Sequence, residues 1–527
     1  MKKILAMLLT LALTLGLLAG CGSKSGDAYV PTGDALLGEN EEPADLRYED
    51  EELQSLTLAY YPNWSMNPLD ADNITNRVLF SLIYQPLFAV SRRNVTYPIL
   101  CSGYRVSEDR RTYTFFVDSN ARFSDGTRVT IEDVQATYEA ARLSNYYSGR
   151  FTYVDSTKIS DDGGLTFYLT TAYQNFPILL DIPILKASEV DAPNPLGSGP
   201  YTFDQVSEEE AQLNRLQNWW CTADLSTAAE TINLITGTSQ MQIRDEFQFG
   251  DLDLACANPM SDSFSDYRCD FELWYCENGV FLYLGCNVLY SDYFKDDGVN
   301  ALRKALTYAI DRDYINTEFY NGLAQPSTLP TSPGSPYYNS SLAAQFAYDP
   351  MKFVDQLSGY QIPRDKKGET HDLRLLVNKD DSVRLRVARY LAETLTEFGI
   401  PTETLEYNAA TYRQVLQAGN FDLYLGQTKL SATMDLSQFY KAYGNNGWGG
   451  IADNTLLNMT QECLADSGNY YNLNQMVAED AKIIPILFGN YTVYAERGQL
   501  LDLSPSRDNV FYYNLGKTMS DVLIASN

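Results

Sequence analysis

The sequence holds one histidine in 527 residues, His371, and this scarcity excludes most imidazole-based chemistry. No second histidine or cysteine stands at ligand spacing from it, so a metal site is not expected, and nickel in particular lacks the nitrogen ligands it prefers. A G-x-S-x-G elbow, a Walker loop and an H-E-x-x-H helix are also absent. No motif therefore points to an enzyme, and no cofactor is expected. Carboxylate pairs are too frequent in so acidic a chain to indicate a hydrolase, which stays a distant alternative.

Basic residues are also scarce. Lysine and arginine number 39 against 68 aspartates and glutamates, which gives a formal net charge of -29 at pH 7. Such a surface repels phosphates, so nucleic acid is excluded as a partner. The composition is otherwise that of a globular protein, with 45% hydrophobic and 20% charged residues. The length exceeds what one hydrophobic core usually supports, so two or three domains are expected.

A hydrophobic run long enough to span a membrane is missing too. Residues 4–18, which follow two lysines, fall short of the roughly 20 residues that a spanning helix needs. They fit the apolar region of a lipoprotein signal peptide over residues 1–20. The Leu-Ala-Gly-Cys that ends at Cys21 resembles a lipobox, whose cysteine receives a lipid; the alternative is a signal peptide that merely ends near a cysteine.

Residues 21–52 are rich in acids and have little apolar surface to bury, which predicts a flexible tether extended by charge repulsion. Lipid at Cys21 and a globular body after the tether predict a protein anchored on the extracytoplasmic face of a bacterial cell membrane, at the cell surface or in the periplasm.

The cysteines favour no metal site. Lipid at Cys21 leaves seven of the eight, an odd number without any C-x-x-C spacing. Most are expected to be small buried hydrophobes. A disulfide within the cluster from Cys256 to Cys286 stays open if the compartment is oxidising.

One stretch, residues 113–142, carries a clear local pattern. Tyr113, Phe115 and Val117 alternate with a less apolar face, which predicts a strand. The Ser-Asp-Gly-Thr of residues 124–127 predicts a turn. Thr130 is a good N-cap with Asp133 three residues later, which predicts a helix after it. These features define a strand, a turn and a capped helix, without any chemistry.

The same stretch resembles the characteristic segment of the family 5 extracellular solute-binding proteins, the receptors of oligopeptide, dipeptide and nickel ABC importers. Tyr104 stands where that family usually has Trp, and Ser124 where His is common. The positions that match the family pattern are Val106, Ser107, Asp109, Phe123, Asp125, Gly126, Thr127, Val129, Thr130, Glu132, Asp133 and Val134.

A second match covers residues 299–312, which read as one amphipathic helix. The positions that fit the family there are Arg303, Ala305, Leu306, Ala309, Ile310, Asp311 and Arg312. Farther on, strands at 373–377, 402–407 and 421–425 alternate with helices at 383–398 and 412–417, which predicts a βαβ lobe with a largely parallel sheet.

The resemblance implies an α/β, two-lobed periplasmic-binding-protein-like fold with an extra subdomain and two hinge crossovers, near residues 284–287 and 485–488. It implies a monomer that delivers its solute to the transmembrane subunits of an ABC permease. The expected division is lobe I at 53–86, 195–285 and 488–527, its extra subdomain at 87–194, and lobe II at 286–487.

Family position also suggests which residues contact the ligand. Peptide-binding members carry Gly-Trp-x-x-Asp just after the strand at 421–425, and the aspartate pairs with the peptide's amino terminus. Residues 426–431 read Gly-Gln-Thr-Lys-Leu-Ser, so the Trp and the Asp are missing, and Lys429 would repel an ammonium group if it points into the cleft. Asp435 is expected to be a structural cap. The candidate ligand-binding residues are Asn67, Tyr84, Asn287, Tyr424, Gln427, Thr428, Trp448 and Phe488.

Three ligands stay open at this point: a peptide bound with altered terminal recognition, an oligosaccharide or other solute stacked on aromatic rings, and, least favoured, nickel. The 39 tyrosines fit either a ligand cleft or ordinary strand-rich packing. For each candidate aromatic the alternative role is core packing.

Overall fold

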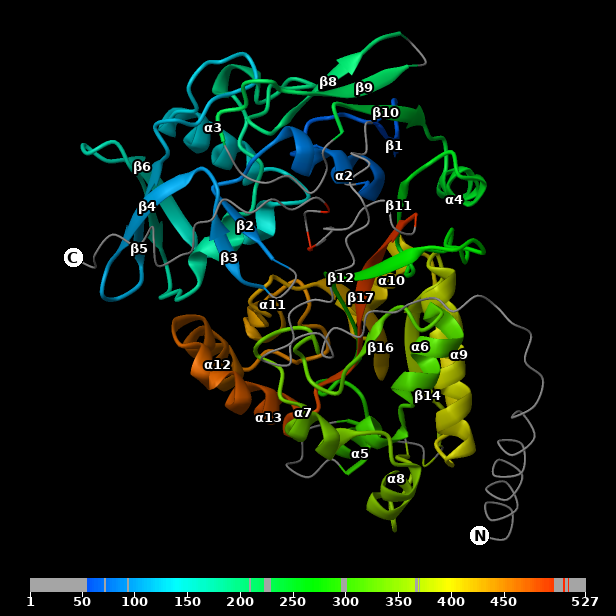
Figure 1. Ribbon diagram of the computed structural model, residues 1–527. Helices are drawn as coiled ribbons and strands as arrows, with labels where there is room; N and C mark the ends of the chain where they lie inside the picture. Colours follow the sequence, from blue (N-terminus) through cyan, green and yellow to red (C-terminus); the bar gives the residue numbers. More distant parts are fainter. Residues whose placement is uncertain are drawn as a thin grey trace, which may run out of the picture.

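The computed structural model describes residues 55–496 except 71–72, 92–93, 208–209, 222–228, 295–300, 365–367 and 369, and beyond them residues 506, 507 and 510. The expected signal peptide, Cys21 and the tether lie outside the described residues. Figure 1 shows two lobes, one above the other, that meet at the paired strands β12 and β17. Within the described part, no helix has the length and apolar character needed to cross a membrane.

One large mixed sheet runs through both lobes in the order β15-β14-β16-β12-β17-β11-β1-β10-β9-β8, with β13 beside β17. The first lobe is built on β1 and β8 to β11, and the second on β14 to β16. The strands are β1 (Ser55–Tyr60), β8 (Tyr201–Gln205), β9 (Ala211–Arg215), β10 (Thr231–Thr236), β11 (Leu254–Ala257), β12 (Glu272–Cys286), β13 (Gln325–Pro326), β14 (Leu373–Asn378), β15 (Thr402–Tyr407), β16 (Leu423–Lys429) and β17 (Ile483–Ala495).

The two central strands form the connection between the lobes. Residues 272–277 of β12 pair with 490–495 of β17 where β17 also borders β11, and residues 281–285 pair with 483–488 where β12 also borders β16. The register shifts between these two stretches, where Gly279 takes a left-handed φ of 74° that suits glycine. The irregularity therefore lies N-terminal to the predicted crossover at 284–287. Every residue of β17 is buried, which explains its long apolar run.

The first lobe carries an additional four-stranded sheet in the order β4-β5-β7-β6. The predicted strand at 113–117 is confirmed as β5, and the predicted helix is confirmed as α3. Thr130 and Asp133 form a capping box, in which each side chain accepts from the other residue's backbone N–H. The elements of this region are α2 (Ile74–Ile83), β2 (Phe88–Val90), β3 (Thr96–Pro98), β4 (Cys101–Val106), β5 (Thr112–Val117), α3 (Ile131–Ala141), η1 (Ser148–Phe151), β6 (Val154–Ile159), β7 (Leu165–Leu169), η2 (Phe176–Leu180), η3 (Ala187–Glu189) and α4 (Gln240–Phe249).

The second lobe has helices on both faces of its sheet. Leu375 and its alternate neighbours on β14 pack with α5, α6, α8 and α9, whereas Leu376 and Tyr424 pack with α10 to α13. β14 is parallel to both β15 and β16, as predicted. The helices are α5 (Ala301–Ala309), α6 (Arg312–Tyr320), α7 (Ser340–Ala343), η4 (Ala344–Phe346), α8 (Pro350–Gln356), α9 (Ser382–Glu397), α10 (Ala409–Ala418), α11 (Ser437–Tyr440), α12 (Asn454–Ala465), η5 (Ser467–Asn469) and α13 (Tyr470–Asp480).

The single helix predicted for residues 299–312 is wrong in its described part, because α5 ends at Ala309 and α6 begins at Arg312. Asp311 is the N-cap of α6, and its side chain accepts from the N–H of Tyr314 at 2.9 Å. Arg312 folds back to donate to the carbonyls of Thr307 and Ile310. The family-like Ile-Asp-Arg thus marks a helix junction.

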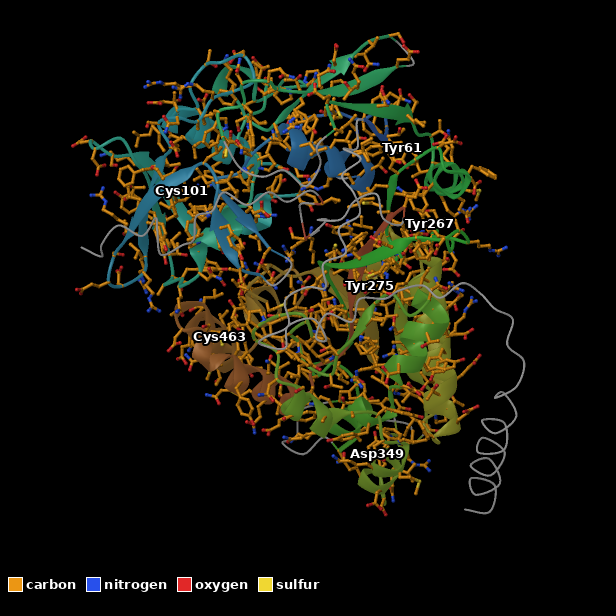
Figure 2. All side chains as sticks on the ribbon, viewed as in Figure 1. Tyr61, Cys101, Tyr267, Tyr275, Asp349 and Cys463 are labelled. Atoms are coloured by element: carbon orange, nitrogen blue, oxygen red, sulfur yellow. The ribbon has the colours of Figure 1, made fainter. Side chains whose placement is uncertain are left out.

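Cysteine and tyrosine serve mainly the interior. Cys101 lies in the first lobe and Cys463 on α12 of the second (Figure 2), and both are buried. Cys256, Cys269 and Cys286 are free thiols, so the disulfide left open within that cluster is not formed. The largest fully buried side chains are mostly tyrosines, which supports the packing interpretation of their abundance.

Candidate functional site

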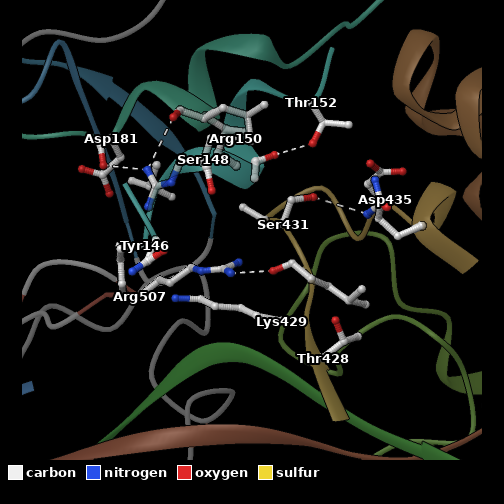
Figure 3. A pocket seen from close by; sticks show the side chains of 18 of the residues that line it. Tyr146, Ser148, Arg150, Thr152, Asp181, Thr428, Lys429, Ser431, Asp435 and Arg507 are labelled. Carbon is white, nitrogen blue, oxygen red and sulfur yellow. Dashed lines mark hydrogen bonds between the residues drawn. The ribbon is translucent and has the colours of Figure 1, made fainter. Parts of the chain in front are cut away.

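A cavity of about 430 Å³ lies between the two lobes (Figure 3). One wall comes from the first lobe, at residues 145–152 and 178–181, and the other from the end of β16 and the loop after it. We call it the central cavity. Its lining residues are Val90, Asn145, Tyr146, Ser148, Gly149, Arg150, Thr152, Ile178, Leu179, Asp181, Thr428, Lys429, Leu430, Ser431, Ala432, Asp435, Gln438, Asn445 and Arg507.

Arg150 organises the first-lobe wall. Its Nη1 donates to the backbone carbonyl of Asp181 at 2.6 Å, and its guanidinium lies over the ring of Tyr147 at 4.9 Å from the centroid. These contacts hold η1 against the segment that follows η2. Arg150 therefore faces the cavity from a fixed position.

Lys429 lies at the end of β16 in the second lobe, and Arg507 contacts that lobe from the C-terminal segment. Lys429 Nζ lies 4.1 Å from the ring centroid of Tyr146, a cation–π contact that crosses between the lobes. Arg507 Nη2 donates to the carbonyl of Leu430 at 2.5 Å. Lys429 therefore lines the cleft, where its charge would repel an ammonium group of the ligand.

A second cavity, of about 250 Å³, adjoins the first. Tyr146, Lys429 and Arg507 line both, so these three side chains stand at the passage between them. The adjoining cavity continues toward α2 and the crossover strand β12, where Arg77 and Asn278 line it. A ligand longer than one cavity has room to extend past these three residues.

The lobes touch at one rim of the cavity through α12 and the loop before α11. Tyr173 and Thr433 share a hydrogen bond of 2.6 Å between their hydroxyls, and the N–H of Gln174 donates to the carbonyl of Leu464 at 2.7 Å. Tyr153 donates to Asp435 at 3.2 Å. Burial raises the pKa of Asp435, and hydrogen bonds from Ser437 and Tyr153 oppose the rise.

They also touch at a second rim, at the N-terminal end of α9, which lies on the other side of the second lobe from α12 (Figure 1). Asp262, in the chain between β11 and β12, accepts from Ser382 Oγ at 2.7 Å and from the backbone N–H groups of Ser382 and Val383 at 3.2 Å. Burial tends to raise the pKa of Asp262, but these bonds at a helix N-terminus outweigh it and lower the pKa. Both contacts, which we call the two rims, thus join the two lobes.

Most predicted site residues lie in the interior rather than in the cavity wall. Asn67 donates to the carbonyls of Val190 and Ala192 at 2.7 and 2.9 Å. Asn287 donates to those of Gly419 and Phe421 at 2.9 and 2.8 Å. Both amides hold loops to the body of their lobe.

The predicted aromatic residues pack in cores. The Tyr84 hydroxyl donates to the carbonyl of Met66 at 2.9 Å, and Tyr424 donates to that of Asn446 at 3.0 Å. Phe488 stacks on Phe281, 4.9 Å between centroids, and Trp448 is partly buried against the core that contains Tyr424.

Of the eight predicted residues, all of them described, Thr428 is the one that lines the central cavity; Gln427, next to it on β16, is exposed. Sequence reasoning missed Tyr146, Arg150 and Arg507. No motif surrounds them, and only the tertiary structure brings segments so far apart in the chain to one cavity. Among the described residues, no group of three or more His, Cys, Asp or Glu side chains is arranged to hold a metal ion.

Comparison with known proteins identifies a family to which the chain is similar. The model of the family described as "Bacterial extracellular solute-binding proteins, family 5 Middle" matches residues 95–450. The chain is similar to the glutathione-binding protein GsiB of Shigella boydii, with 21% identity over 66% of this chain and 68% of that protein. It is similar to the oligopeptide-binding protein AppA of Bacillus subtilis, with 24% identity over 77% of this chain and 80% of AppA.

Solved structures share the fold. The ABC transporter substrate-binding protein CtaP of Listeria monocytogenes superposes with a TM-score of 0.68 at 19% identity, covering 87% of this chain and 97% of CtaP. AppA of Bacillus subtilis in complex with a nonapeptide gives a TM-score of 0.59 at 18% identity, covering 86% and 97%. These likenesses confirm the predicted two-lobed α/β fold.

Proposed function

This chain belongs to the bacterial extracellular solute-binding proteins of family 5, which makes it the solute-binding component of an ABC importer, and we propose that it captures a peptide in its central cavity. The observation that carries the proposal is the cavity itself, which both lobes wall and beside which Tyr153 and Asp435 join the lobes. A solute held there contacts both lobes at once. It therefore stabilises the closed arrangement, which a permease recognises in turn.

A peptide is supported by the size and chemistry of the space. The central cavity falls within the roughly 300–1,000 Å³ of ordinary ligand sites. Its wall mixes hydroxyls such as Ser148, Thr152 and Ser431 with apolar residues such as Ile178 and Leu179, as a ligand with amide groups and varied side chains requires. AppA and GsiB, by their names, bind an oligopeptide and glutathione.

A neutral oligosaccharide is the second candidate, and the hydroxyls of Ser148, Thr152 and Ser431 in the wall are groups to which a sugar would bond. The relatives named above are binding proteins rather than enzymes. We accordingly propose binding without catalysis, by a monomer that meets its permease through the closed lobes. A secreted hydrolase is the distant alternative.

The test is native mass spectrometry of residues 53–527 purified without denaturation, because a closed cleft releases its solute only when the lobes open. We expect bound masses that differ by amino-acid residue masses. Bound masses at hexose spacing would replace the peptide proposal by the sugar one. A protein that arrives empty and then binds neither class in thermal-shift screening would contradict both.

We also propose that Cys21 carries the lipid anchor and that residues 21–52 tether the lobes to the extracytoplasmic face of the membrane. The support is the lipobox-like Leu-Ala-Gly-Cys and the acidic stretch after it. Replacing Cys21 by Ala in the full chain should move the protein from the membrane fraction to the soluble extracytoplasmic fraction. Retention of Cys21→Ala in the membrane fraction would contradict the anchor.

A further inference from the structure

We propose that Lys429 and Arg507 form an anion subsite that binds a carboxylate of the solute. The inference rests on the proposed function, because it assigns a chemical class to the solute of the same cavity. It concerns the passage between the central and the adjoining cavity, which both cations line.

Arg507 presents an unused hydrogen-bonding edge. Its Nη2 is held by the carbonyl of Leu430, while its Nη1 is buried and has no hydrogen-bond partner among the described residues. A buried N–H of a charged group without an acceptor is costly, so such a group points to a ligand. A guanidinium tied at one nitrogen and open at the other matches the two oxygens of a carboxylate.

Lys429 adds a second positive charge at the same passage. The ring of Tyr146 lies under its ammonium group, which fixes the direction of an otherwise flexible side chain. Figure 3 shows the Lys429 and Arg507 side chains next to each other, with the Arg507 guanidinium bonded to the carbonyl of Leu430. Two cations facing one partly enclosed space create a potential that attracts an anion and repels an ammonium group.

The described acids near the subsite form no ion pair with Arg507. Asp435 accepts hydrogen bonds from Ser437 and Tyr153, and Figure 3 shows it in another part of the cavity. Glu277 on β12 is the other nearby acid; burial raises its pKa, and a hydrogen bond with Ser332 and the charge of Arg507 oppose that rise. No described carboxylate lies within ion-pair distance of Arg507. A carboxylate from the solute would supply that missing charge.

The structure therefore favours the opposite charge arrangement to that of peptide-binding relatives, in which an aspartate pairs with the amino terminus of the peptide. The position that would recognise a peptide's amino terminus carries no acid here, and the cavity recognises an acid of the peptide instead. Two sources share this chemistry, the C-terminal carboxylate and the side chain of a glutamate or aspartate, and the experiment separates them.

The test uses residues 53–527 freed of bound solute and four pools of random pentapeptides made from Ala, Gly, Ser, Leu, Tyr and Glu. The first pool has free termini, the second is amidated at the C-terminus, the third is acetylated at the N-terminus, and the fourth has Gln in place of Glu. Binding is measured by native mass spectrometry and by competition at equal concentration.

We expect loss of the recognised carboxylate to weaken binding by about tenfold to a hundredfold, as for other charge-assisted hydrogen bonds. Amidation causes this loss if the C-terminus is bound, and Gln for Glu causes it if the side chain is bound. Acetylation changes binding much less in either case. The variants Lys429→Met and Arg507→Met should each lose the preference for pools that keep the recognised carboxylate over the pool that lacks it.

Lys158→Met and Arg413→Met, at exposed positions outside the cavity, are the matched controls and should keep the preference. Melting temperatures check that all four variants fold, and Lys429, at the exposed end of β16, tests the subsite even if Arg507→Met does not fold. Equal binding of all four pools by the wild-type protein, or an unchanged preference in Lys429→Met, would overturn the subsite and leave the peptide proposal standing. Wild-type protein that binds no pool would overturn the peptide proposal itself.

Discussion

Arg312 and Arg507 are both drawn into the protein, yet their surroundings differ. Every nitrogen of Arg312 donates to a carbonyl or hydroxyl, including the carbonyl of Pro485 on the crossover strand β17 at 2.9 Å. Burial lowers its pKa to about 9, which still leaves the guanidinium charged at neutral pH. Arg507 has one buried nitrogen without any partner among the described residues. The first arginine completes the fold, and the second is available to a ligand.

The same contrast separates the other polar residues. Asn67 and Asn287 use their amides on carbonyls of their own lobe, whereas Lys429 and Asp435 contact the opposite lobe across the cavity. Polar residues of the first kind govern the free energy of unfolding, and those of the second kind govern closure and affinity. The following predictions test that division.

The largest expected effect is that of Arg312→Met. It leaves the carbonyls of Thr307, Ile310, Ser327 and Pro485 without this donor, so the free energy of unfolding should fall by roughly 3 kcal/mol or more. Urea denaturation measures it, with the exposed Arg413→Met as control, for which we expect a change within about 0.5 kcal/mol. Equal stability of Arg312→Met and the wild type would mean that this arginine does not hold the crossover.

A smaller loss of stability is expected for Asn287→Ala. The carbonyls of Gly419 and Phe421 and the N–H of Tyr290 lose their partner, at a cost of about 2–3 kcal/mol, while solute affinity in the folded protein stays the same. The exposed Asn420→Ala, in the same loop, is the control. Titration calorimetry beside thermal denaturation decides the matter: an affinity loss without a stability loss would return Asn287 to the binding site that family position suggested.

The smallest effect is a pH dependence that differs between the two rims. The pKa of Asp435 is raised, so its contribution to stability is present at low pH and is lost as the pH rises through the raised value. The pKa of Asp262 is lowered, so its contribution is present at neutral pH and is lost as the pH falls through the lowered value.

Melting temperatures of Asp435→Asn and Asp262→Asn, each relative to wild type between pH 7 and about pH 2.5, measure the two slopes, because the lowered pKa of Asp262 lies below the ordinary carboxyl value of about 3.9. Acidification should make wild type gain on Asp435→Asn and lose on Asp262→Asn. Slopes of the same sign for both variants would show that the rims do not differ as described. Tyr153 and Lys441 face Asp435, and burial raises the pKa of Tyr153, so its phenol stays neutral throughout this interval.

Local patterns in the sequence predict the fold well where the partners of a residue are close in the chain. Thr130 and Asp133 form the expected capping box because both groups belong to one helical turn. The parallel strands of the second lobe were also predicted, because strand and helix segments alternate along the chain there. The junction between α5 and α6 was not predictable from periodicity, because Asp311 fits a helix interior as well as an N-cap. The hydrogen bond from Arg312 to the distant carbonyl of Pro485 appears only in the tertiary structure.

The cavity could be predicted only in part. Thr428 follows from its place near the end of β16, but Tyr146, Arg150 and Arg507 come from segments that no motif marks. Asn67, Tyr84 and Phe488 were proposed from family position, and the structure gives each a local partner in the interior. Resemblance finds residues that a family keeps near its cleft, and it does not distinguish those that support the wall from those that face the ligand.

The most direct test of the central claim, that both lobes enclose the solute, is hydrogen–deuterium exchange of residues 53–527 with and without the bound solute. We predict simultaneous protection of residues 145–152 in the first lobe and 428–435 in the second, which lie on opposite walls of the cavity. Protection confined to one lobe, or centred away from both segments, would contradict the account.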